Sequence, residues 1–158
     1  MLYRYLESSA DHRRDYIAKI PHSVALGLDI VEAGPRRCVL RLPFQPPLAE
    51  THGGLANGAV STLLDNAGGV AVFCSLEKPM DFSTLSLRVE FITAAVAGKD
   101  VYARVECLRL AGRQVHIRGT ADCGDADQPG QPFAIVSGVF FLKPGGTPLH
   151  HTQTPANV

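Results

Sequence analysis

A carboxylate in the middle of a long apolar stretch is the first feature of this sequence that could do chemistry. The stretch is His52–Cys74, HGGLANGAVSTLLDNAGGVAVFC, and Asp65 lies near its centre. Aspartate is a poor residue for a helix interior and is costly to bury as an anion, so this position calls for a reason. Asp65 could serve as a general base or a nucleophile, or it could be an aspartate held by structural hydrogen bonds.

Helical periodicity defines the element that would position Asp65. Apolar residues recur along the stretch at steps of three or four, which predicts one long helix with a buried face: Val60, Leu63, Leu64, Ala67 and Ala71. Small or polar residues flank Asp65 one turn away on either side, Ser61 and Thr62 before it and Gly68 and Gly69 after it. The aspartate therefore lies on a polar stripe of an otherwise apolar helix.

Composition excludes several classes of function. The 158 residues include 15 basic and 15 acidic side chains, so no basic field favours nucleic acid or an anionic membrane as a partner. No uninterrupted apolar run reaches the roughly 18 residues of a membrane span. The sequence holds neither a GxSxG motif nor a phosphate-binding P-loop, and its histidines lack the spacing of a metal site. We expect no metal and no cofactor.

The four cysteines are scattered through apolar segments, without a CxxC pair: Cys38, Cys74, Cys107 and Cys123. This spacing favours buried free thiols over a disulfide framework or a zinc site. We therefore expect a protein of a reducing compartment, the cytoplasm.

The chain before the long helix predicts helices followed by a hairpin. Leu2–Ala10 and Asp11–Ile20 read as one or two short helices, and PHSVALGLDI from Pro21 reads as a turn that enters a strand. Strands are expected at Leu28–Glu32 and Cys38–Leu42, around the turn AGPRR. Pro43–Glu50 holds three prolines and is expected to be an irregular loop.

The chain after the helix predicts four antiparallel strands, separated by turns rich in Gly, Asp and Pro: Phe82–Thr93, Val101–Leu110, Gln114–Cys123 and Phe133–Leu142. In the first of them, Leu85, Leu87, Val89 and Phe91 alternate with polar residues and are expected on the buried face.

The predicted fold is α+β, an antiparallel β-sheet wrapped around one long central helix. We expect one domain over residues 1–143, with an N-terminal helical segment, and a flexible tail over residues 144–158. A sheet with a single helix of its own has an edge left over. Phe82–Thr93 is a candidate for that edge, which a homodimer would cover.

These residues resemble a known family. The order of elements, the helix NGAVSTLLDNAGG and the strand TLSLRVEF together resemble hotdog-fold acyl-CoA thioesterases of the PaaI-like, phenylacetate-pathway type, over roughly Ala25–Leu142. In that family the central helix carries its catalytic carboxylate in the context TLxD, followed by Asn, Ser or Thr and then Ala. The match TLLDNA places that carboxylate on Asp65, and TLSLRVEF places the family's hydroxyl near the reaction centre on Thr84.

The sequence departs from the family at the glycine-rich segment HGG that starts the helix. At the family's spacing from Asp65 the segment falls on Ala56–Asn57–Gly58, whereas a literal HGG lies four residues earlier, at His52–Gly53–Gly54. We interpret ANG as the equivalent, because GAVSTLLDNA then continues without a gap. This departure bears on activity and leaves the predicted fold unchanged.

The resemblance implies hydrolysis of an acyl-CoA at a dimer interface. Backbone N–H groups of Asn57 and Gly58 at the helix N-terminus would hold the oxyanion. Asp65 would act as general base on water or attack the carbonyl to give an anhydride, with Asn66 and Thr84 in support. In the hotdog dimer the helix end of one subunit faces the carboxylate of the other. Whether two such dimers associate into a tetramer is left open by the sequence.

Other residues are candidates for binding the substrate, which would be an aryl- or medium-chain acyl-CoA. The acyl group would meet Val60, Phe82 and Leu85, with His22 and His52 near the pocket. The CoA phosphates would need surface cations, for which the candidates are Arg88, Arg109, Arg113 and Lys143.

Two alternatives remain open. The altered HGG segment favours a non-catalytic dimer that binds acyl-CoA or another acyl ligand. A hotdog hydratase would require a histidine close to the aspartate, and DNAGG lacks one.

Overall fold

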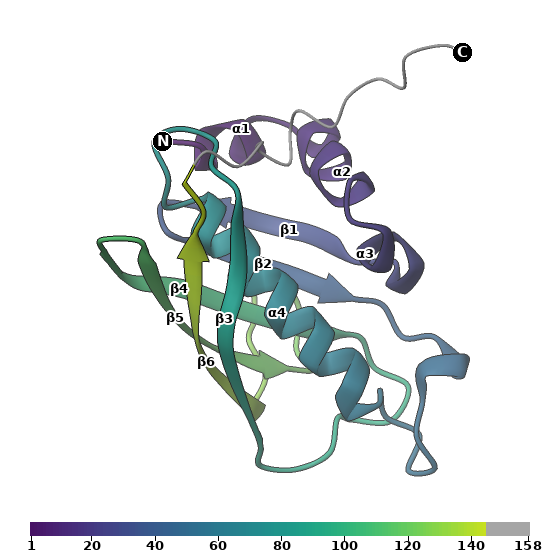
Figure 1. The fold of residues 1–158 in the computed structure, drawn as a ribbon. Coiled ribbons are helices and arrows are strands. Elements are labelled where there is room, and N and C mark those ends of the chain that lie inside the picture. The colour runs from purple at the N-terminus through teal and green to yellow at the C-terminus, as the bar shows by residue number, and fades with distance from the viewer. Residues whose placement is uncertain (145–158) are drawn as a thin grey trace, which may run out of the picture.

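The computed structural model describes residues 1–144, so the predicted tail lies, apart from Pro144, outside the described residues. The chain begins with two short helices, α1 (Tyr3–Ser8) and α2 (Ala10–Ala18), as the sequence indicates (Figure 1). Ser9 separates them because its side chain accepts a hydrogen bond from the Asp11 N–H and caps α2. Both helices pack against the first strand of the sheet.

A third helix corrects the turn predicted after Pro21. Helix α3 spans Pro21–Leu26, with proline at its start and Gly27 at its end. Proline fits the first turn of a helix because its missing N–H would have no partner there. Gly27 adopts φ 66°, the left-handed conformation that terminates helices. The apolar residues of this segment are thus helical before the strand begins.

Within the described residues, six strands form one antiparallel sheet in the order β1-β2-β4-β5-β6-β3. Their bounds lie close to the predicted runs: β1 Asp29–Gly34, β2 Arg37–Leu42, β3 Phe82–Phe91, β4 Val101–Ala111, β5 Gln114–Asp122 and β6 Pro132–Leu142. The last four strands do not form a simple meander, because β3 pairs with β6 and lies at the edge (Figure 1). The opposite edge, β1, is covered by α1 and α2.

A bulge in β3 corrects the predicted alternation of that strand. The pairing of β3 with β6 shifts between Thr84 and Ser86, which leaves Leu85 without a register partner and 59% exposed. Thr84 is opposite Phe140, a buried residue of the core, so the two share the inner face of the sheet. One extra residue therefore turns Leu85 outward and Thr84 toward the helix.

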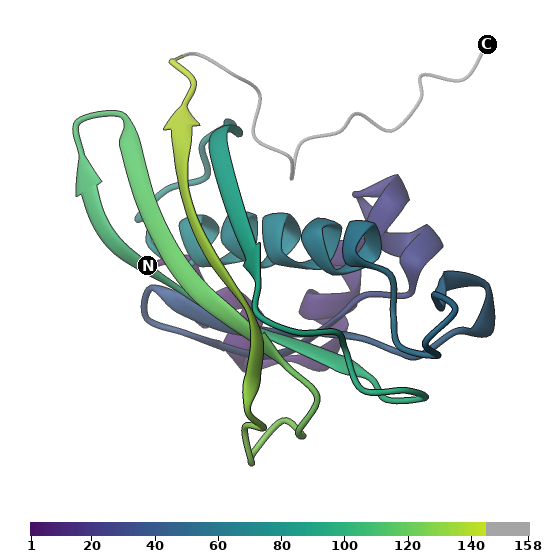
Figure 2. The same ribbon diagram turned by 90° about the horizontal axis from the view of Figure 1, so that it is seen from below.

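Helix α4 (Asn57–Phe73) lies in the concave face of the sheet, which curves around it (Figure 2). Its apolar face is fully buried and contacts β2, β4 and β5 among other strands. Gly68 lets the helix approach the sheet closely, because a Cβ there would lie 2.8 Å from the Phe140 ring. The predicted sheet wrapped around one long helix is confirmed, and no helix among the described residues is long and apolar enough to span a membrane.

The segment before α4 is more regular than its prolines suggest. Pro46–Leu48 form one turn of 3-10 helix, η1, and Ala49 pairs with Leu55 across a tight turn. Gly53 adopts φ 86°, and a Cβ on Gly54 would overlap the carbonyl oxygen of Ala95. The literal HGG thus belongs to this turn, whereas α4 begins at Asn57 with Ala56 as its N-cap.

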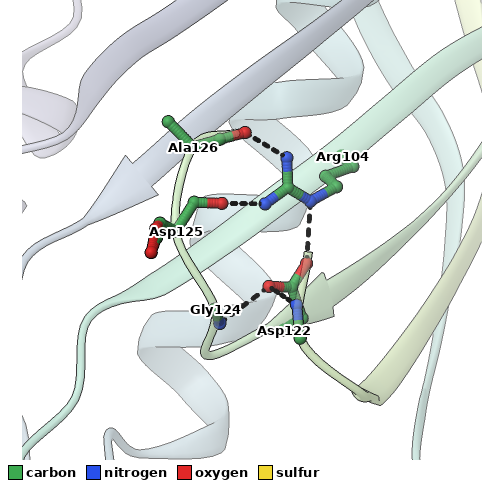
Figure 3. A network of polar contacts seen from close by, with 6 residues as sticks. Arg104, Asp122, Gly124, Asp125 and Ala126 are labelled. Atoms are coloured by element: carbon green, nitrogen blue, oxygen red, sulfur yellow. Dashed lines mark hydrogen bonds and ion pairs between the residues drawn. The ribbon is translucent and has the colours of Figure 1, made fainter. Parts of the chain in front are cut away.

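A buried ion pair fixes the loop between β5 and β6. Asp122 is 1% exposed and accepts hydrogen bonds from the Arg104 Nε and from the Gly124 and Gly130 N–H groups (Figure 3). The other nitrogens of Arg104 donate to the carbonyls of Asp125 and Ala126. Every charged group of this network has partners, as a buried pair requires.

Candidate active site

Asp65 and Thr84 meet where α4 crosses the start of β3. The Thr84 hydroxyl donates a hydrogen bond of 2.7 Å to Asp65 Oδ1. The carboxylate is half-buried and Thr84 is exposed, so this pair lies at the open surface along the free sheet edge. Such a hydrogen bond orients the carboxylate and leaves its second oxygen available to water or substrate.

The Asn66 side chain contacts helix α3, whereas that of the preceding Asp65 contacts strand β3. The Asn66 Oδ1 accepts a hydrogen bond of 2.6 Å from Ser23 of α3, and its Nδ2 donates to the carbonyl of Thr62. Ser23 is completely buried, so this contact ties α3 to α4 inside the protein. The structure thus brings Thr84, but not Asn66, onto the Asp65 carboxylate, and Ser23 is a partner that sequence spacing does not reveal.

The N-terminus of α4 carries the two predicted oxyanion donors. Ala56 offers no side-chain cap. The Asn57 N–H donates to Glu50 Oε1 at 3.2 Å, whereas the Gly58 N–H has no hydrogen-bond partner within residues 1–144. A Cβ on Gly58 would meet nothing within 4 Å, so the helix start opens to solvent. One predicted donor is free and the other is occupied.

The turn before α4 presents an acidic and a basic side chain at the helix start. Glu50 Oε2 lies 3.6 Å from His52 Nδ1. His52 is among the residues predicted from the sequence, whereas Glu50 is not, because a residue seven positions before the helix carries no spacing signal. The tight turn between them produces the juxtaposition.

Asp65 and the start of its own helix are too far apart to act on one carbonyl group. Asp65 lies eight positions after Asn57, which corresponds to about 12 Å along the helix at 1.5 Å per residue. A reacting carbonyl needs both its base or nucleophile and its oxyanion donors within about 3 Å. Within one chain the site is therefore incomplete.

The remaining candidates occupy varied positions. Val60 is completely buried in the core, and Phe82 is half-buried, with its ring edge-on to Phe140 at 6.1 Å. Leu85 is exposed at the bulge, and His22 is exposed on α3. Phe82 and Leu85 thus lie on the same strand as Thr84, whereas Val60 faces the interior.

Two of the four candidate phosphate ligands are already paired. Arg88 lies 2.9 Å from Glu90, and Lys143 lies 3.5 Å from Asp81. Arg109 and Arg113, at the far end of the β4–β5 hairpin, are exposed and have no ion-pair partner in the described part of the chain.

Comparison with known proteins gives the family. Residues 52–129, which include α4, β3, β4 and β5, match the model of the thioesterase superfamily. A protein from Halobacterium salinarum that is named an esterase is 29% identical over 115 residues, 65% of this chain and 72% of that protein.

Solved structures agree with this match over most of the chain. A protein from Pseudomonas aeruginosa is 32% identical, with a TM-score of 0.72, and covers 85% of this chain and 98% of its own. The phenylacetic acid degradation protein PaaI from Thermus thermophilus, as a mutant, is 25% identical with a TM-score of 0.66 over 77% of this chain and 97% of its own. The chain thus belongs to the thioesterase superfamily and has the hotdog fold, and PaaI phenylacetic acid degradation proteins are among the solved structures that it resembles.

Proposed function

We propose that this protein hydrolyses an acyl-CoA thioester to a carboxylic acid and CoA, at a site shared by two copies of the chain. The observation that carries the proposal is the Asp65 carboxylate, held by Thr84 on the open surface of a thioesterase-superfamily fold. The family membership supports thioester hydrolysis in general. The acyl-CoA substrate, the role of Asp65 and the dimer are our additions.

Asp65 supplies the nucleophile in one of two ways. As a general base it takes a proton from water, whose oxygen then bonds to the carbonyl carbon while the C–S bond breaks. As a nucleophile its oxygen bonds to that carbon, and water hydrolyses the resulting anhydride. In both routes the thiolate of CoA leaves and takes up a proton. The Gly58 and Asn57 N–H groups, at the positive end of the helix dipole, stabilise the oxyanion.

The free edge of the sheet supports the dimer. Among the described strands, β3 lies at the uncovered edge, and an exposed strand of this length is a template for pairing with another strand. Two β3 strands related by a twofold axis run antiparallel, so the start of one strand meets the end of the other.

The chain beyond the end of β3 leads to the start of α4. Ala95 and Gly98 contact the turn at Gly53 and Gly54, with a hydrogen bond of 3.0 Å from the Gly98 N–H to the Gly53 carbonyl. Antiparallel pairing therefore brings the α4 N-terminus of one copy toward Asp65 of the other. This arrangement supplies the half of the site that a single chain lacks.

The acyl group is aryl or medium-chain in this proposal. Phe82 and Leu85 offer apolar surface on the strand that carries Thr84. A relative named as a phenylacetic acid degradation protein supports an aryl-acyl ester. Arg109 and Arg113, which are exposed and have no ion-pair partner among residues 1–144, are the candidates for the CoA phosphates. The free cysteines fit a reducing compartment, and we place the reaction in the cytoplasm.

A second candidate function is a dimer that binds acyl-CoA without hydrolysing it. The observation that favours it is the occupied Asn57 N–H, since Glu50 already holds one of the two oxyanion donors.

The test is thiol release from aryl-, short-, medium- and long-chain acyl-CoA esters, followed with a chromogenic thiol reagent. We expect Asp65→Asn to lower kcat by at least about 100-fold, the usual size of a general-base contribution. Asp15→Asn, which neutralises an exposed aspartate on α2, is the matched control and should keep wild-type activity.

An enzyme-only blank corrects for the protein's own cysteines. Equal turnover by wild type and Asp65→Asn would refute the role of Asp65, and binding without turnover would establish the second candidate.

A further inference from the structure

Glu50 lies directly on the helix start that the proposed reaction needs. Its Oε1 accepts the Asn57 N–H at 3.2 Å, and its Oε2 lies 3.6 Å from His52 Nδ1. The side chain is 45% exposed, so it has room to move into solvent.

The backbone around Glu50 is built to present it there. The Glu50 N–H donates to the Gly54 carbonyl at 2.9 Å, and the Gly53 N–H donates to the Glu50 carbonyl at 2.8 Å. The left-handed Gly53 closes this turn. Because Ala56 has no side-chain acceptor, Glu50 serves as the cap of α4 from a neighbouring turn.

This cap and the substrate compete for the same N–H group. A carboxylate at a helix N-terminus is stabilised by the helix dipole, as an oxyanion would be. The Asn57 N–H can donate a strong hydrogen bond to only one of them, and a carboxylate that stayed in place would repel the second negative charge.

We propose that Glu50 is a displaceable cap, which holds the Asn57 N–H in the free protein and turns into solvent when the thioester oxygen binds. The inference rests on the proposed function, because it assumes that this helix start receives the thioester. The cap lowers the apparent affinity for substrate, because only the population with Glu50 displaced is competent to bind.

Replacing Glu50 by glutamine tests this competition. The amide oxygen can still accept the Asn57 N–H, so α4 remains capped. A neutral acceptor holds an N–H less strongly than a carboxylate and carries no repelling charge. We expect Glu50→Gln to bind ester about fivefold more tightly, a change that corresponds to about 1 kcal/mol. Purely structural capping predicts no gain in affinity.

The measurement is calorimetric titration in the Asp65→Asn background, where turnover does not consume the ligand. The probes are phenylacetyl-CoA, octanoyl-CoA and the uncharged S-phenylacetyl-N-acetylcysteamine. Glu32→Gln is the matched control, since Glu32 is 50% exposed, pairs with Arg37 on the β1–β2 hairpin and lies away from α4's start. Tighter binding of the uncharged probe by Glu50→Gln alone supports the cap.

Two results would overturn the proposal. One is an unchanged or weaker affinity of Glu50→Gln for all three probes. The other is a tightening limited to the CoA esters and shared by Glu32→Gln, which would be a general effect of net charge on an anionic ligand.

The wild-type thiol-release assay separates this proposal from the proposed function. Turnover without tighter binding by Glu50→Gln refutes the cap alone. Tighter binding without turnover supports the cap in a binding protein and refutes hydrolysis. A chain that binds none of the probes in any variant refutes both.

Discussion

At the scale of single residues, the half-buried Asp65 carboxylate is held by the hydroxyl of Thr84 and has no ion pair among residues 1–144. Thr84 donates to Oδ1 at 2.7 Å, which restricts the orientation of the carboxylate. The Thr84 side chain is short and β-branched, so few other χ1 rotamers compete with the one that makes this contact.

Removing that hydroxyl should therefore slow the reaction without abolishing binding. We expect Thr84→Val to lower kcat about tenfold, because a hydrogen bond to a charged group contributes about 1.5 kcal/mol. KM for the preferred ester should change little, and Thr84→Ser should restore most of kcat. Steady-state thiol release by the three proteins measures this. A wild-type kcat in Thr84→Val would show that the contact is not part of the reaction.

Part of the candidate site could be predicted from the sequence, because two of its residues stand out by their type and context. Asp65 was detectable because an aspartate in an apolar helix violates its usual preference, and Thr84 because its strand resembles a family motif. Glu50 and Ser23 were not, because their partners are 7 and 43 residues away and depend on a turn and on helix packing. The catalytic roles of Asp65 and Thr84 stay predictions, as do those of Asn57, Gly58 and Asn66.

At the scale of elements, two glycines of α4 have opposite surroundings. A Cβ on Gly68 would lie 2.8 and 2.9 Å from two ring atoms of Phe140, which is buried and cannot easily move. A Cβ on Gly58 would meet nothing within 4 Å. Neither residue adopts a positive φ, so alanine is compatible with both backbones.

The same substitution should thus have opposite effects at the two positions. We expect Gly68→Ala to lower the free energy of unfolding by about 1–3 kcal/mol through overpacking. Gly58→Ala should raise it by about 0.4–1 kcal/mol, since alanine restricts the unfolded chain more than glycine does. Urea denaturation of both variants beside wild type gives the two values. Shifts of the same sign would contradict this description of the helix–sheet contact.

Most elements were predictable because their hydrophobic periods are long and clean. The period of α4 and the alternation of β4, β5 and β6 gave their type and nearly their bounds. The β3 bulge, α3 and the partner of β3 were not predictable, because each depends on contacts with another element. The strict alternation expected for β3 was therefore wrong at Leu85.

At the scale of the whole molecule, residues 1–144 leave one edge of the sheet without a partner strand. The N-terminal helices cover β1, whereas β3 carries Leu85 at 59% and is followed by Ile92 at 61% exposed. Large apolar side chains on an edge strand whose outer side has no partner strand favour association through that edge.

A charge on this edge should therefore weaken the dimer. We expect wild type to be a dimer or a larger assembly of dimers by light scattering, and Leu85→Lys to shift the mass toward the monomer, because lysine on an edge strand blocks pairing. Leu110→Lys, at an exposed apolar residue near the end of β4, is the control and should keep the wild-type mass. A fully dimeric Leu85→Lys would place the interface elsewhere.

The buried cysteines have a consequence for a protein that would release a thiol at every turnover. Burial raises the pKa of the Cys74 thiol to about 12 and that of Cys38 well above its usual range, and Cys107 is buried as well. Because only a thiolate attacks a disulfide, Cys38 and Cys74 resist forming mixed disulfides with oxidised CoA. Cys123, the one cysteine that is not fully buried, is where such an adduct would form first. Burial thus keeps the thiols of the core apart from the thiol that the proposed reaction would release.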